Sequence, residues 1–464
     1  MRVSVISAGL LLLISNPARS QDTLATNKNT GYSSEKIYSG FIRSGLYTWV
    51  DKSDDKLYFP GAYADLGLNL ATGNGKNFKS FTDIRFRYGT EFLKPVNRFD
   101  IREAWIGVNG KKWNFSAGQK IIKWGRADFT NLTSKLSPIN MISRSPDRED
   151  MSMGNLLVSA NYYPLPKVKF EAVAVPYYRS SVLIIEPVRL PEYVVIKQLP
   201  TLVTEKEMFS YAFKTDFHFK LFDWSLSWFD GYDPLPGIAL TDFSLDLTQP
   251  VPVPFIELSV RPYKTRVIGI DFETIIGAVG LRGEAAWSDP ELSYEINEYV
   301  PYPEIKWVLG ADWSKGIWRF TGEYSGKFIA DYSPSSVEPV IGTETDFSQI
   351  AALISIPGFN IEDYVKLQVQ AFNRLYNNQL KQYYNSAAMK VEAELQYGKL
   401  LPSVITMYNF TSKDMLIIPE LKIKPADGLA ITIGAEIYSG RKGSLYDLID
   451  DFMNGAYVSL RVDF

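Results

Sequence analysis

The residues best suited to act on a solute lie close together in this 464-residue chain, between Gly118 and Asn155. Side chains of both charges mix along this segment: Lys120, Lys123, Arg126, Lys135, Arg144 and Arg148 are interleaved with Asp128, Asp147, Glu149 and Asp150. If the segment lines a pore, opposed charges produce a transverse field that favours polar or charged solutes. The alternative is that these charges pair with each other and with a surrounding wall, and serve only to hold the segment in place.

Motifs for catalysis and metal binding are absent from the sequence. It contains no GxSxG, GxxxxGK[ST], HExxH or CxxC motif, no cysteine, and a single histidine, His218. A net charge of -3 leaves no basic excess to neutralise phosphates, which argues against a nucleic-acid partner. We therefore expect no enzyme, no cofactor, no metal site and no nucleic-acid partner.

The elements that must position these charges are β-strands, in which side chains point alternately to the two faces of a sheet. Apolar and charged residues alternate in one clear example: Thr82, Ile84, Phe86 and Tyr88 lie between Asp83, Arg85 and Arg87. The pattern returns in residues 209–218, 268–273, 389–397 and 429–436. A lysine or arginine facing the midplane of a bilayer costs about 2–4 kcal/mol, so the charged faces must point into a water-filled lumen.

Segments of this kind, about 20 in all, predict an all-β protein. The predicted fold is a single transmembrane antiparallel up-and-down β-barrel of about 16–20 strands, with a long loop folded into the lumen. No segment after the N-terminus has about 18 consecutive apolar residues, which excludes a helical membrane protein. A soluble protein of two β-domains is the alternative, but nothing between residues 36 and 464 looks like a linker.

Connections of two kinds alternate along the chain. Tight turns are expected at the periplasmic end, at 109–112, 314–316, 357–360 and 425–428. Long loops are expected outside, at roughly 124–154, 178–206, 231–262, 289–303, 329–346 and 440–453. The loop segments 182–203 and 234–254 are unusually apolar. They either pack on one another as an extracellular lid or catch an amphiphilic solute.

The two ends of the chain carry further signals. Residues 1–20 have a basic start, a short apolar run and small residues before a cleavage position, which predicts a cleaved signal peptide. Residues 21–35 are polar and predict a flexible periplasmic lead-in, and residues 36–464 form the barrel. The last nine residues alternate strictly, with Val458, Leu460, Val462 and Phe464 on one face and Tyr457 and Arg461 on the other.

This terminal strand resembles the closing strand of Gram-negative outer-membrane β-barrels. The spacing of Gly118-Gln119, Trp124-Gly125, Asp128, Pro138, Asn140 and the stretch from Asp150 to Gly154 is similar to the third-loop region of the porin superfamily in the broad sense, including alginate-export-like and other large-porin barrels. The resemblance implies that residues 124–154 narrow the lumen. It also implies that the terminal strand is an assembly signal, for which we select Tyr457, Leu460, Val462 and Phe464.

We therefore predict an outer-membrane channel for passive, substrate-selective diffusion of small polar or charged solutes. The residues predicted to line its pore or constriction are Arg85, Arg87, Lys120, Lys123, Arg126, Asp128, Arg144, Asp147, Arg148 and Glu149. The expected partners are the lipid bilayer and lipopolysaccharide, the barrel-assembly machinery, periplasmic chaperones and a small-molecule solute. The alternatives are a transporter of hydrophobic or amphiphilic compounds and a non-conducting adhesin or scaffold. The chain is expected to be a monomer or a trimer.

Overall fold

The computed structural model describes residues 35–51, 56–73, 77–183, 193–197, 208–246, 248, 253–337, 339 and 356–464. The predicted signal peptide, residues 1–20, lies outside the described residues. So does the predicted lead-in, except for its last residue, Glu35, which begins the first strand.

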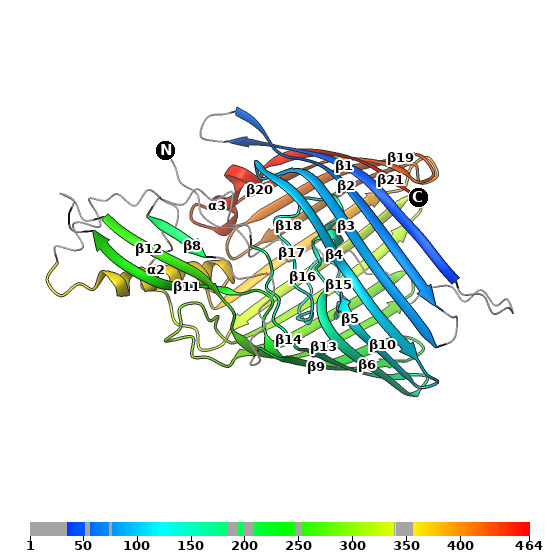
Figure 1. Ribbon diagram of the computed structural model, residues 1–464, viewed down its shortest axis with the longest axis horizontal. Helices are drawn as coiled ribbons and strands as arrows, with labels where there is room; N and C mark the ends of the chain where they lie inside the picture. Colours follow the sequence, from blue (N-terminus) through cyan, green and yellow to red (C-terminus); the bar gives the residue numbers. More distant parts are fainter. Residues whose placement is uncertain are drawn as a thin grey trace.

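Within the described part of the chain, one 18-stranded antiparallel sheet closes on itself as a barrel (Figure 1). Its strands are β1 (Glu35–Asp51), β2 (Lys56–Gly73), β3 (Phe78–Glu91), β4 (Lys94–Asn109), β5 (Trp113–Lys120), β6 (Asn155–Leu165), β7 (Val168–Val175), β9 (Ser210–His218), β10 (Phe222–Tyr232), β13 (Lys264–Ile276), β14 (Val279–Pro290), β15 (Glu304–Lys315), β16 (Trp318–Ile329), β17 (Tyr383–Ala393), β18 (Leu400–Asn409), β19 (Met415–Ala426), β20 (Leu429–Ser439) and β21 (Gly455–Asp463). The predicted fold class is confirmed.

Strand β21 closes the ring and shows how the sequence pattern builds the wall. It pairs with β1 from Phe41 opposite Asp463 to Tyr47 opposite Tyr457. The apolar side chains of Val458, Leu460 and Val462 are 43–46% exposed on the outer face, whereas Tyr457 on the inner face is 4% exposed. Exposed apolar residues on the outside and polar residues within are the arrangement that a bilayer requires.

Short turns join the strands at one end of the barrel and longer connections join most of them at the other. The turns 110–112, 166–167, 219–221, 277–278, 316–317 and 427–428 lie at what we call the short-turn end. The connections 121–154, 176–209, 233–263, 291–303, 330–382 and 440–454 lie at the opposite, long-loop end. The predicted division into two classes of connection is thus correct.

One predicted turn is wrong. Residues 357–360 lie not at the short-turn end but inside the connection from β16 to β17, directly before the helix α2 (Ile361–Tyr376). The side chain of Asn360 caps this helix by accepting hydrogen bonds from the backbone N–H groups of Glu362 and Asp363. The sequence from Pro357 and Gly358 to Asn360 is compatible with a hairpin turn and with the start of a helix. The turn prediction was wrong because the sequence alone does not distinguish the two.

A second, smaller sheet projects from the long-loop end (Figure 1). It consists of the hairpin β11 (Gly237–Asp246) and β12 (Val253–Arg261), with β8 (Val194–Lys197) added parallel to β12. Helix α2 is anchored to it by Asn373, whose side chain bonds to the backbone N–H and carbonyl of Ile238. Leu183, Val194, Ile238 and Leu240, from the two apolar segments, belong to or pack against one buried cluster, which favours the first of the two alternatives, packing of the loops on one another.

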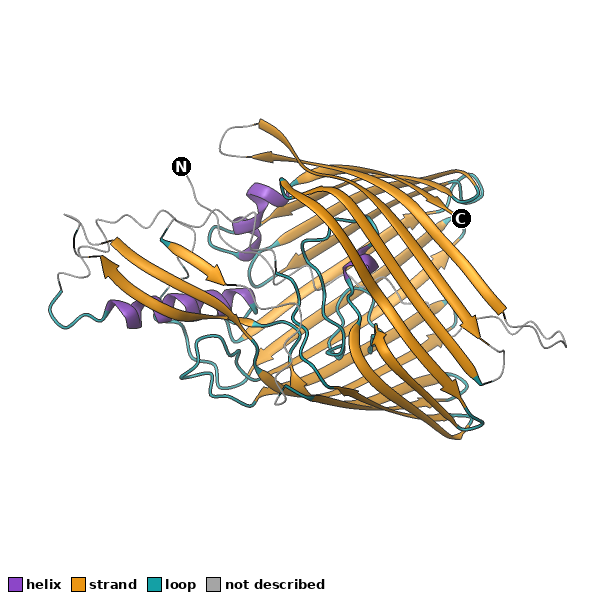
Figure 2. Ribbon diagram, in the orientation of Figure 1, coloured by secondary structure: helices purple, strands orange, loops and turns teal. Residues whose placement is uncertain are grey.

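The buried apolar core also lies at the long-loop end. A further helix, α3 (Leu445–Met453), packs beside β20 and β1, and its residues Tyr446, Ile449 and Phe452 join one buried cluster with Trp49 and Phe92. Among the described residues, neither α-helix combines the length and apolar character needed to cross a membrane. Figure 2 shows irregular chain within the barrel, between the walls formed by the strands.

Candidate selectivity site

The segment between β5 and β6, residues 121–154, is bonded to strands on two sides of the barrel. We call it the inner loop. Its first part is held by two glutamates of the wall. Glu284 on β14 accepts hydrogen bonds from the backbone N–H groups of Arg126, of Ala127 at 2.7 Å and of Leu132 at 3.0 Å. Glu323 on β16 accepts from the N–H groups of Asp128 and Thr130.

The backbone of Gly125 makes this arrangement possible. Its φ of +95° lies in the region that residues with a side chain rarely adopt. A Cβ atom at this position would also meet the carboxylate of Glu284. Glycine therefore lets consecutive N–H groups converge on one carboxylate, which explains the Trp124-Gly125 element of the sequence pattern.

Ion pairs fasten the same part of the inner loop to the wall. Arg126 contacts Asp271 on β13 at 2.7 Å and Glu273 at 3.1 Å. Asp128 contacts Arg282 on β14 at 2.7 Å. Burial raises the pKa of Asp128 to about 6, although the positive charge of Arg282 lowers it.

The second part of the inner loop is tied to a distant part of the ring. Asp150 contacts Arg43 on β1 at 2.6 Å, and Asp147 contacts Arg461 on β21 at 2.7 Å. Arg144 and Arg148 both contact Glu436 on β20, at 3.2 and 3.6 Å. Strands β20, β21 and β1 are separated from β13–β16 in the ring by β17–β19 on one side and by the remaining strands on the other. The inner loop is therefore bonded to groups of strands that are not neighbours in the ring.

A cavity of about 80 Å³ lies between the inner loop and the wall formed by β1–β4. Arginine dominates its lining: Arg43, Arg85, Arg87, Arg98, Arg102 and Arg179. We call this group the arginine cluster. The acidic lining residues are Asp65, Asp100 and Asp150. Six arginines face three aspartates in the lining itself. Asp83, Glu91 and Asp147 do not line the cavity but form ion pairs with arginines of the cluster, so six carboxylates balance the six arginines.

The arginine cluster is built by pairing and stacking. Asp65 accepts hydrogen bonds from both Arg43 and Arg87, and the Arg87 guanidinium lies 3.8 Å from the ring centre of Tyr63. Burial disfavours ionisation of Asp150, but Arg43 and the neighbouring arginines lower its pKa well below the usual value. Arg98 stays within reach of a solute, because its side chain is 30% exposed.

Most of the predicted site residues lie in this arrangement. Arg85 and Arg87 belong to the arginine cluster, while Arg126, Asp128, Arg144, Asp147 and Arg148 tie the inner loop to the wall. The exceptions are Lys120, Lys123 and Glu149. Lys120 lines a separate hollow with Lys79 and Lys169, burial lowers the pKa of Lys123, and Glu149 is exposed.

The sequence analysis missed several residues that build the site. Among them are the wall groups Arg43, Arg98, Arg102, Glu284, Glu323 and Glu436. The signal that could have found Arg98 is its inward position in an alternating strand. The same alternation includes Arg102. Glu103 breaks it, because the register of β3 and β4 shifts between Asp83 and Ile84 and Glu103 also reaches the lumen side, where it accepts a bond from Ile121.

Comparisons with known proteins support the fold. No protein-family model matches the chain, and no curated protein sequence matches it. Solved structures match the chain. OccAB4 of Acinetobacter baumannii matches with a TM-score of 0.53 at 8% identity, over 94% of this chain and 99% of that one. OccK3 (OpdO) of Pseudomonas aeruginosa matches with a TM-score of 0.52 at 8% identity, over 93% of this chain and 96% of that one. The chain has the fold of an Occ outer-membrane porin.

At such identities the likeness concerns the porin fold, and the side chains of the site must be judged in this chain alone. The porin fold requires a wall that is apolar outside and polar within, and the described strands meet that requirement. No group of three or more metal-binding side chains occurs in the part of the chain that the structure describes. His218 lies at the short-turn end, where its Nδ1 is 3.2 Å from Asp223.

Proposed function

We propose that the protein is a channel of the Gram-negative outer membrane, through which small polar or charged solutes diffuse passively. In this proposal the short-turn end faces the periplasm and the inner loop, including residues 124–154, narrows the lumen. The solute passes between the inner loop and the wall without any chemical step. The porin fold supports the channel, and the charges of the site support its selectivity.

The arginine cluster is the observation that carries the proposed selectivity. Its six arginines outnumber the three aspartates on the lining of a cavity of about 80 Å³ beside the inner loop. Arginine keeps its charge at any physiological pH, and its planar fork matches carboxylate and phosphate groups. We therefore propose that anions pass more readily than cations of the same size.

The alternative of a transporter for hydrophobic or amphiphilic compounds rested on the apolar outer loops. In the described residues, Ile238 and Leu258 of the β11–β12 hairpin are buried against Val369 and Phe372 of α2. These apolar groups are used in packing, which favours a polar solute. We include no catalytic step in the proposal, because diffusion down a gradient needs none.

The proposal can be tested in planar lipid bilayers with the purified, refolded protein. Reversal potentials in a gradient of potassium chloride give the ratio of chloride to potassium permeability. The double variant Arg85→Gln and Arg98→Gln removes two charges that a solute can reach, since these side chains are 20% and 30% exposed. The matched control is Arg319→Gln, an exposed charge on β16 that pairs with Glu392 outside the arginine cluster.

We expect a chloride-selective channel, a several-fold lower permeability ratio in the double variant, and less than a two-fold change in the control. A folded protein without conductance would overturn the channel proposal. A conducting double variant with the permeability ratio of the unmodified protein would remove the arginine cluster from the selectivity mechanism, and leave the channel itself standing.

A further inference from the structure

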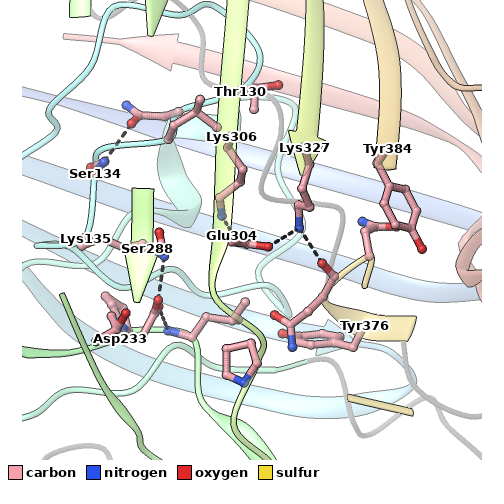
Figure 3. A pocket seen from close by; sticks show the side chains of 18 of the residues that line it. Thr130, Ser134, Lys135, Asp233, Ser288, Glu304, Lys306, Lys327, Tyr376 and Tyr384 are labelled. Carbon is pink, nitrogen blue, oxygen red and sulfur yellow. Dashed lines mark hydrogen bonds and ion pairs between the residues drawn. The ribbon is translucent and has the colours of Figure 1, made fainter. Parts of the chain in front are cut away.

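A second cavity lies near the long-loop end, beside a stretch of the inner loop that does not line the cavity of the arginine cluster. Figure 3 shows part of its lining. Its floor is formed by residues 130–137 of the inner loop, and its walls by the ends of β13–β18 near the long loops and by residues 376–378. We call it the vestibule cavity. Its volume of about 200 Å³ is below the range of about 300–1000 Å³ for typical small-molecule pockets, so only a small solute fits.

The charged groups of the vestibule cavity are matched among themselves. Glu304 on β15 contacts Lys306 at 2.5 Å and Lys327 at 2.9 Å, as the dashed lines of Figure 3 indicate. Lys135 of the inner loop contacts Asp233 at 2.6 Å. Among the lining residues, three lysines against two carboxylates leave a surplus of one positive charge.

The charged groups of these ion pairs also form hydrogen bonds with neutral groups. Lys327 also donates to the backbone carbonyl of Asn377 at 2.6 Å, and the side chain of Gln379 donates to Glu304 at 2.9 Å. Asp233 accepts a second bond from the backbone N–H of Leu235 at 2.9 Å. A charged solute would have to break these contacts, and each buried charge left unpaired would be costly.

Among the described residues, the lining groups that lack a hydrogen-bond partner include neutral hydroxyls, which must turn toward a ligand to bond it. Ser288 and Tyr376 line the cavity, and their buried hydroxyl oxygens have no hydrogen-bond partner among the described residues. Other hydroxyls and amides share the lining, such as Thr130, Asn378 and the hydrogen-bonded pair of Ser325 and Ser386. A hydroxyl both donates and accepts, so this lining matches a ligand whose own groups do the same.

We propose that the vestibule cavity is a second solute site, which binds neutral polyhydroxylated molecules of the size of a monosaccharide or sugar alcohol. The proposal deepens the channel function and rests on it for the way in which the solute reaches the cavity. Tyr263 and Tyr376 add aromatic surface for the apolar face of a sugar ring. The channel would thus have one site for neutral solutes and another for anions.

Binding can be measured at equilibrium, without conductance, by saturation-transfer NMR on the full-length protein in detergent micelles. Glucose is the neutral probe, and gluconate is a charged probe of similar size. We expect saturable glucose binding in the millimolar range. Ser288→Phe should fill the cavity and weaken glucose binding at least ten-fold. The matched control is Ser403→Phe on β18, which is on the wall but does not line the vestibule cavity.

Two further variants test the hydroxyl group and the charge of the vestibule cavity separately. Ser288→Ala removes the open hydroxyl without adding bulk, so it should weaken glucose binding about 2- to 12-fold, the equivalent of one hydrogen bond. Glu304→Gln leaves Lys306 and Lys327 without their carboxylate. It should weaken glucose binding and strengthen gluconate binding, because the cavity becomes cationic.

The outcomes separate this site from the channel function. Absence of saturable glucose binding, or equal glucose affinity in Ser288→Phe and the unmodified protein, would overturn the vestibule site even if the protein conducts. Gluconate binding that is abolished by Ser288→Phe would also overturn it, since the cavity would then be an anion site. Glucose binding to a protein that does not conduct would retain the site and reject the channel.

Discussion

The attachment of the inner loop to the wall glutamates gives the sharpest test of the structure. Glu284 accepts three backbone N–H groups of the loop through both of its carboxylate oxygens. Glu284→Gln keeps the size of the side chain but replaces one acceptor oxygen with an NH2 donor. That donor would face the N–H of Leu132 or those of Arg126 and Ala127, so at least one bond is lost whichever way the amide turns.

The expected loss follows from the bonds involved. A hydrogen bond to a charged group contributes about 1.5–3 kcal/mol, and Gln also lacks the charge that strengthens the remaining bonds. We expect the docked inner loop to lose about 2–3 kcal/mol relative to the undocked state. Because 1.4 kcal/mol is a factor of ten, undocking should become about 30- to 150-fold more frequent.

Hydrogen–deuterium exchange measured by mass spectrometry reports this directly. In Glu284→Gln the peptide that contains residues 126–132 should exchange faster by the same factor, while peptides from β13 and β15 remain protected. Glu323→Gln should act in the same direction on Asp128 and Thr130. The matched control is Glu392→Gln, a wall glutamate of β17 that pairs with Lys390 and Arg319.

Single-channel recordings provide the functional readout, since an undocked loop should produce additional conductance levels that the unmodified protein lacks. If exchange of 126–132 were unchanged in both Glu284→Gln and Glu323→Gln, the glutamates would not hold the loop, and the reasoning would be refuted. Equal acceleration in Glu392→Gln would show a general loosening of the wall instead.

Three other predictions follow from particular residues. Burial raises the pKa of Asp128 to about 6 despite Arg282, so acidification through pH 6 neutralises Asp128, favours the folded state and frees positive charge. The chloride-to-potassium permeability ratio should rise below pH 6, and Asp128→Asn should abolish this step. Gly125→Ala should speed exchange of the inner loop, since its φ is +95° and a Cβ atom would meet the wall carboxylate; Gly277→Ala, at φ +63° with open space, should leave the loop unchanged. Phe464→Ala should reduce the heat-modifiable, folded fraction in outer membranes several-fold if the terminal aromatic is an assembly signal; unchanged yield would contradict that role.

The barrel could be predicted because every strand of its wall must be apolar on the lipid side and polar on the lumen side. Each strand separates lipid from water, so alternation in stretches such as Thr82 to Tyr88 reports the fold directly. The rule fails where a segment leaves the wall. Residues 361–376 form a helix that packs on the small sheet, and nothing in a period-two search detects it. The same holds for the start of that helix at Asn360, whose Pro-Gly surroundings also suit a turn.

The candidate site was predictable only in part. The charges of the inner loop stand out in sequence, but their partners do not: Glu284 and Glu323 look like any other lumen carboxylate until the fold brings them to the loop backbone. Glu103 reaches the inner loop through a shift in strand register, which alternation cannot foresee. The alternation within a strand therefore identifies the residues that face the lumen. Which of these residues contact one another depends on the closed barrel and cannot be read from one strand.

The bonds of the inner loop constrain the order in which the molecule is assembled. Ala127 bonds to a residue 157 positions later in the chain, and Asp147 to one 314 positions later, on the last strand. The bond to Arg461 cannot form before β21 joins the ring, so the inner loop has its full set of contacts only once the seam between β1 and β21 closes. Sealing the seam would then be the late step that creates the solute path, because before it the lumen remains open to the side.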